Sequence, residues 1–161
     1  MDGEAVIGVL PNLARKKGFL GFGRDTFNVV LTQNRIIFAL LTSQMIKDEA
    51  QRAREEAKAR GDNIFKKMWN TATAGYNVHK RYPAMAPDAI LAETAGNFVI
   101  DPNAVTRMKY KNGGINDNHS SSDIITFEYS GAKLRLETQN GSASLKDARS
   151  ALVSAYGERF K

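Results

Sequence analysis

The first forty residues consist of short apolar runs separated by polar turns, a pattern typical of antiparallel strands. Residues 5–10 are apolar up to a proline and predict a first strand. Residues 12–25 are rich in glycine, lysine and arginine, and they predict a loop. The β-rich runs 27–31 and 35–41 are joined by three polar residues, so they predict a tight antiparallel hairpin.

From Ser43 the apolar residues recur at intervals of three and four, which is the helical period. The first helix is predicted to end at Gly61. A second amphipathic helix follows, and a short helical turn is expected from Pro87 to Leu91 because proline is favoured at the first helical position. Residues 43–92 therefore predict a helical insertion between two strands.

Strand patterns return in four further segments of the chain. They are residues 97–100, 105–111, 123–129 and 132–138. In the second of them, Thr106, Met108 and Tyr110 alternate with basic residues, which predicts one buried face and one basic face. A polar loop is expected over 112–122, and a last helix is predicted to begin at Ser144, whose side chain can cap it.

These elements predict a single α+β domain over residues 1–161. Seven antiparallel strands form a partly open barrel, a C-terminal helix caps it, and the helical insertion lies between the third and fourth strands. Two short sheets leave an open end, and an amphipathic helix of roughly 16 residues can cover such an end. We expect this fold to be self-sufficient without residues 43–92. Another small α+β sheet is the alternative.

The predicted hairpin carries a resemblance to a known family. Residues 28–38, with the sequence NVVLTQNRIIF, resemble the Thr-x-x-Arg-apolar-apolar-Phe hairpin of bacterial and GRAM-type pleckstrin-homology domains. The resemblance covers most of the chain outside residues 43–92. It implies a pleckstrin-homology-like fold and a binding module in which the loop between the first two strands faces the ligand.

The amino-acid composition favours an anionic partner and excludes several kinds of chemical site. The chain has 23 basic and 17 acidic residues, and its net charge of +6 favours an anionic partner such as phospholipid or nucleic acid. It has no cysteine, which excludes disulfides, thiolate zinc sites and thiol nucleophiles. No apolar run approaches the roughly 18 residues of a transmembrane helix, and the N-terminal residues lack the pattern of a secretory signal. We therefore expect a cytoplasmic protein.

The residue patterns of common active sites are missing from the sequence. The histidines are His79 and His119, so no single motif offers two of them to a metal ion. Residues from Asp117 to Glu128 have the spacing of a calcium loop, but Ser122 stands where that loop needs glycine. The chain also has no G-x-S-x-G nucleophile motif and no phosphate-binding loop. We expect no enzymatic activity, no metal ion and no cofactor.

The strongest candidate site is the segment from residue 15 to residue 24. Its four cations bracket three large apolar side chains, a combination that suits an anionic membrane surface. The candidate residues are Arg15, Lys16, Lys17, Phe19, Leu20, Phe22 and Arg24. The alternative is that the three apolar side chains fold back and cap the barrel.

A second candidate site lies in the insertion, where residues 64–87 contain cations and aromatic residues but no acidic residue. The candidate residues for binding a partner are Lys66, Lys67, Trp69, Lys80 and Arg81. The alternative is that the aromatic side chains of this segment pack on the first helix or on the sheet.

Together these patterns predict a non-catalytic binding or docking module for a membrane surface or a protein partner. Two other functions remain open. A scaffold could self-associate through the insertion, giving a homo-oligomer, and basic patches could bind nucleic acid, although the sequence has no nucleic-acid-binding motif.

Overall fold

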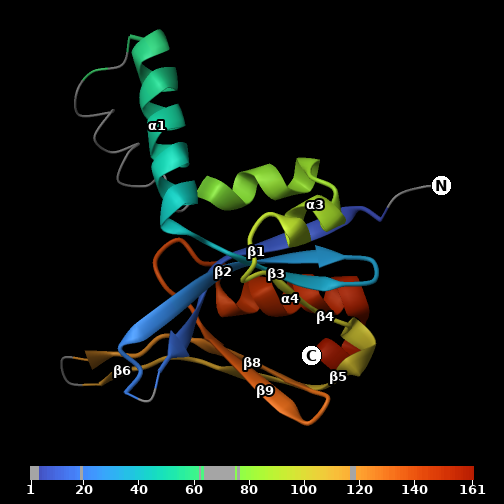
Figure 1. Cartoon of the computed structure of the whole chain (residues 1–161). Helices are drawn as coiled ribbons and strands as arrows, with labels where there is room; N and C mark the ends of the chain where they lie inside the picture. The colour runs from blue at the N-terminus through green and yellow to red at the C-terminus, as the bar shows by residue number, and fades with distance from the viewer. Residues whose placement is uncertain (1–3, 19, 62, 64–74, 76, 117–118) are drawn as a thin grey trace.

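The computed structural model describes residues 4–18, 20–61, 63, 75, 77–116 and 119–161. Its main feature is a seven-stranded antiparallel sheet with the strand order β4-β3-β2-β1-β9-β8-β5 (Figure 1). The seven strands are β1 (Val6–Lys17), β2 (Gly23–Thr32), β3 (Ile36–Leu40), β4 (Phe98–Ile100), β5 (Val105–Lys111), β8 (Ile124–Tyr129) and β9 (Ala132–Glu137). The sheet is not closed, so the predicted α+β fold with an open, barrel-like sheet is confirmed.

The described helices agree with the sequence pattern, whereas most of the predicted second amphipathic helix lies outside the described residues. They are α1 (Ser43–Ala59), η1 (Val78–Ala84), α3 (Pro87–Ala92), η2 (Pro102–Ala104), α4 (Leu145–Tyr156) and η3 (Glu158–Phe160). The Ser144 side chain accepts a hydrogen bond from the backbone N–H of Asp147, as predicted, and Thr42 caps α1 in the same way. Gly61 follows α1 with a φ of +70°, a conformation that favours glycine over other residues.

The main core lies inside the curved sheet and is covered by α4 on the open side. Leu145, Ala148 and Leu152 are the buried residues of α4. They pack against the same cluster as Phe38 and Phe127, whose rings meet edge to face at 5.6 Å. The predicted role of the C-terminal helix as a cap is therefore confirmed.

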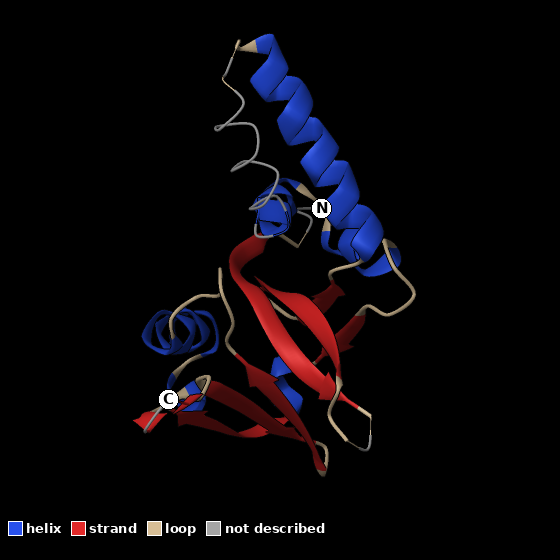
Figure 2. Cartoon of the chain, turned by 90° about the vertical axis from the view of Figure 1, so that its left-hand side faces the viewer, coloured by secondary structure: helices blue, strands red, loops and turns tan. Residues whose placement is uncertain are grey.

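A second core lies on the outer face of β2 and β3, where the last part of the insertion packs. Tyr82 of η1 and Ile90 of α3 are completely buried against Val30, Ile37 and Ala39. In contrast, α1 projects away from the sheet (Figures 1 and 2). The insertion thus has a projecting part and a packed part, and deleting residues 43–92 would uncover Val30, Ile37 and Ala39.

The structure corrects the predicted loop over residues 12–25. Most of that segment belongs to β1 and β2, and only residues 18–22 connect the two strands. β1 passes through the proline because the register with β2 shifts between Leu10 and Leu13, which forms a bulge. The bulged Asn12 has a φ of +56°, and its backbone N–H donates to the Asn28 side chain at 3.1 Å. At a bulge the missing N–H of Pro11 removes no ladder hydrogen bond.

Two smaller corrections concern the second half of the chain. Thr106 is exposed rather than buried, because another register shift lies between Val105 and Arg107. The predicted polar loop contains a short hairpin, formed by β6 (Ile115–Asn116) and β7 (His119–Ser120).

Candidate functional site

The β1–β2 hairpin ends in a tight loop over residues 18–22, here called the hairpin tip. Gly18 and Gly21 have φ values of +83° and +67°, which other residues rarely adopt, and the Gly21 N–H donates to the Gly18 carbonyl at 3.1 Å. The tip exposes two large apolar side chains, with Leu20 70% and Phe22 88% accessible. These two side chains therefore do not cap the barrel. Phe19 lies outside the described residues.

Three of the four predicted cations surround this tip. Lys16 lies opposite Arg24 in the β1–β2 ladder, and Lys17 is the last residue of β1. Each of these three residues is exposed. Lys17 lies 3.4 Å from Asp25, whereas no ion pair of Arg24 is found among the described residues. The tip therefore combines positive charge with exposed apolar area.

Arg15 is the predicted cation that also contacts the core. Its guanidinium donates to the Asp25 carboxylate at 2.8 Å and lies over the ring of Phe27, 5.1 Å from the ring centre. The ring centre of Phe98 lies 5.9 Å from the guanidinium carbon. The hydrogen bond from Arg15 holds the pKa of Asp25 below its usual value. Arg15 therefore belongs mainly to the core boundary.

A repeated charge pattern runs from the tip across five neighbouring strands. Three carboxylates each lie between two cations, one at a shorter and one at a longer distance. The triads are Asp25 with Arg15 (2.8 Å) and Lys17 (3.4 Å), Glu137 with Lys16 (3.1 Å) and Arg135 (3.4 Å), and Glu128 with Lys109 (2.5 Å) and Lys133 (3.5 Å). Six cations thus share three carboxylates, so the nine side chains of the triads carry an excess of three positive charges.

The middle triad borders a groove that the sequence did not predict. β1 and β9 pair only at Ala14 and Glu137, and beyond that pair the two strands diverge. The resulting cavity has a volume of about 440 Å³. It is lined by Arg15, Lys16, Tyr129, Lys133, Leu134, Arg135 and Glu137, and we call it the β1–β9 groove.

The second predicted site, in the insertion, is only partly described. Lys66, Lys67 and Trp69 lie outside the described residues. Lys80 is exposed on η1, whereas Arg81 forms an ion pair with Glu93 and lies over the ring of Tyr82. The structure therefore brings Lys80 and Arg81 into one short helix but gives Arg81 a role in packing.

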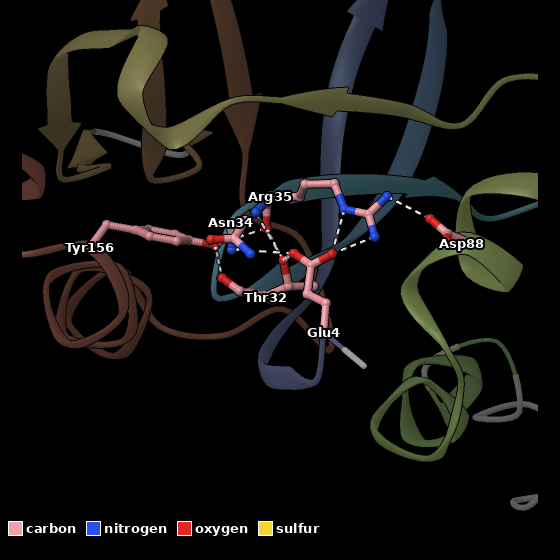
Figure 3. Close-up of polar contacts among 6 residues, drawn as sticks. All are labelled: Glu4, Thr32, Asn34, Arg35, Asp88 and Tyr156. Carbon is pink, nitrogen blue, oxygen red and sulfur yellow. Dashed lines mark hydrogen bonds and ion pairs between the residues drawn. The ribbon is translucent and has the colours of Figure 1, made fainter. Parts of the chain in front are cut away.

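A polar cluster at the opposite end of β2 joins four parts of the fold (Figure 3). Arg35 donates through Nε to Glu4 at 2.7 Å and through Nη1 to Asp88 of α3 at 2.7 Å. The Tyr156 hydroxyl lies 2.9 Å from both the Thr32 and the Arg35 carbonyl oxygens. Burial opposes ionisation of Glu4, but hydrogen bonds, led by that from Arg35, outweigh it and lower its pKa. These partners satisfy one another, so the cluster fastens α3 and α4 to the sheet.

The described part of the chain shows no metal cluster. No group of three or more histidine, aspartate or glutamate side chains in it could hold a metal ion. Asp117, the first residue of the calcium-like spacing, lies outside the described residues, and Glu128 is held by Lys109 and Lys133. No described helix is both long enough and apolar enough to span a bilayer.

Comparisons with known proteins give a distant structural likeness and no family. No protein-family model matches the chain, and no curated protein is similar to it. Among solved structures, it is similar to the C-terminal domain of an unknown protein from Leishmania infantum, with 9% sequence identity and a TM-score of 0.48. The likeness covers 96% of this chain and 86% of that one. Nothing about function follows from so distant a likeness.

Proposed function

We propose that this chain is a non-catalytic docking module of pleckstrin-homology-like fold, and that its hairpin tip attaches to an anionic membrane surface. The seven antiparallel strands and the helix α4 across the open side support the proposed fold. One observation carries the function. The tip presents Leu20 and Phe22 to solvent at the end of a long hairpin, with three cations beside them.

The chemistry of the tip suits a charged interface. Lys16, Lys17 and Arg24 attract anionic lipid, and each contributes about 1 kcal/mol near the surface. Burying Phe22 and Leu20 among the lipids adds about 1.5–3 kcal/mol for each side chain. The gross attraction of about 6–9 kcal/mol is reduced by the loss of rotational and translational freedom. The module should therefore bind reversibly.

The test is co-sedimentation with vesicles of neutral phosphatidylcholine and with vesicles that also contain phosphatidylserine. The protein should bind the anionic vesicles, and Phe22→Ser with Leu20→Ser should weaken binding at every salt concentration. Replacing Lys16 and Lys17 by Gln should weaken binding mainly at low salt, because exposed charges are screened within about 8 Å at physiological ionic strength.

A matched control is Ile7→Ser, which removes another exposed apolar side chain, 48% accessible and at the other end of β1. This variant should bind like the parent. The proposal is wrong if the parent does not bind anionic vesicles, or if Ile7→Ser and Phe22→Ser weaken binding equally.

A further inference from the structure

We propose that the β1–β9 groove binds an extended acidic peptide, which adds as a strand to the free edge of β9. The inference does not rest on membrane docking, because the peptide site lies between two strands and the tip lies beyond them. Three features of the groove support it: its strand edge, its loosely held cations and the alternation of its side chains.

The first feature is an unpaired strand edge. All six residues of β9 pair with β8 on one side, but on the other side only Glu137 pairs with a described strand. The edge from Ala132 to Leu136 is therefore unpaired, and its central residues Lys133, Leu134 and Arg135 line the groove. Every second residue of a strand directs its N–H and C=O groups to the same edge. Such an edge is a template for an added strand, which forms backbone hydrogen bonds with it.

The second feature is the freedom of two cations on β9. Lys133 and Arg135 are 69% and 60% exposed, and each is the more distant cation of its triad. Their carboxylates are held at shorter distances by Lys109 and Lys16. Exposed ion pairs contribute little to stability, so Lys133 and Arg135 can turn toward an incoming carboxylate.

The third feature is the alternation of side chains along the free edge. Lys133 and Arg135 point to one face of β9 and flank Leu134, which is buried on the other face. Directly opposed residues of paired strands have their Cβ atoms about 4.5–5.5 Å apart. An added strand with acidic residues at every second position would place its carboxylates beside these cations. About five residues would match the free edge.

The groove favours carboxylates over a compact polyphosphate. Its wall includes Glu137, whose side chain is almost buried between Lys16 and Arg135. That fixed negative charge reduces the local positive potential and opposes a ligand with several charges at one point. A peptide distributes single charges along the edge and also uses its backbone groups, which a polyphosphate lacks.

The test uses the full chain, labelled with nitrogen-15, and a synthetic peptide of three Glu-Val repeats. Amide shifts should appear at Leu134, Arg135 and Leu136 as peptide is added at millimolar concentration. The same peptide methylated on alternate backbone nitrogens should not produce them, because it keeps the charge but cannot pair as a strand. A peptide of Lys-Val repeats should also fail.

Replacing Lys133 and Arg135 by Ala should weaken binding about tenfold, which corresponds to about 1.4 kcal/mol. The control variant Lys47→Ala with Lys146→Ala removes the same charge from exposed sites on α1 and α4, and it should bind like the parent. The proposal is overturned if the methylated peptide binds equally well or if no peptide shifts the β9 amides. It is also overturned if inositol hexakisphosphate is the only probe that shifts them.

Discussion

The second core provides the most direct test of how the insertion contributes to stability. Ile90 of α3 is completely buried and belongs to the cluster that covers Val30 and Ile37 on the outer face of the sheet. We expect Ile90→Ala to lower the free energy of unfolding by about 2–5 kcal/mol, the usual range for truncating a buried isoleucine. For a chain of this length, that loss corresponds to a decrease in Tm of about 4–20 °C.

The measurement is unfolding by urea, followed by far-UV circular dichroism, together with a thermal melt. The matched control is Leu20→Ala, which truncates an aliphatic side chain of the same size that is 70% exposed at the hairpin tip. Its effect should stay within about 0.5 kcal/mol. If Ile90→Ala is no more destabilising than Leu20→Ala, the packing of α3 on the sheet does not support the fold and the reasoning fails.

Three further predictions concern other parts of the fold. Tyr156→Phe should lower the unfolding free energy by about 0.5–1.5 kcal/mol in urea titrations, since it removes the hydroxyl that reaches the β2–β3 turn; an unchanged midpoint would contradict this role. The pKa of Glu4 is lowered from 4.5, so its ionised form stabilises the fold above that pH, and the contribution is lost as the pH falls through the lower, folded value. Glu4→Gln should therefore reduce the loss of stability in acid, and an identical acid profile in parent and variant would refute the linkage. Gly113→Ala should destabilise the chain in thermal melts, because a Cβ there would lie 1.8 Å from the Ser121 carbonyl oxygen, whereas Gly114→Ala meets no atom within 4 Å and should melt like the parent.

Elements whose pattern is local could be predicted from the sequence. A capping residue and one apolar stripe predict the helix α4. Two β-rich runs around a polar turn predict the β2–β3 hairpin. For β1 the sequence predicts too short a strand, because proline usually ends a strand. Its continuation depends on Asn12, which is held by the Asn28 side chain and by the Gly141 carbonyl. These partners lie 16 and 129 residues away, so no local pattern could reveal them.

The β1–β9 groove was missed for a related reason. The alternation of Lys133, Leu134 and Arg135 is visible in the sequence and places both cations on one face of a strand. What makes them a candidate site is the free edge of β9 beside β1, which exists because the two strands pair only at Ala14 and Glu137. The sequence pattern therefore predicts that the cations of β9 share one face, but it does not predict the β1–β9 groove beside them.

The structure decides between two interpretations of Leu20 and Phe22 at the hairpin tip. The sequence left open whether its apolar side chains cap the barrel or remain exposed. In the structure, Arg15 covers this end of the core, because its guanidinium lies over Phe27 and is fixed by Asp25. A planar guanidinium can stack on an aromatic ring and still keep its charge at the surface. Since Arg15 performs this capping, Leu20 and Phe22 are not needed for it, and their exposure leaves them available to a partner.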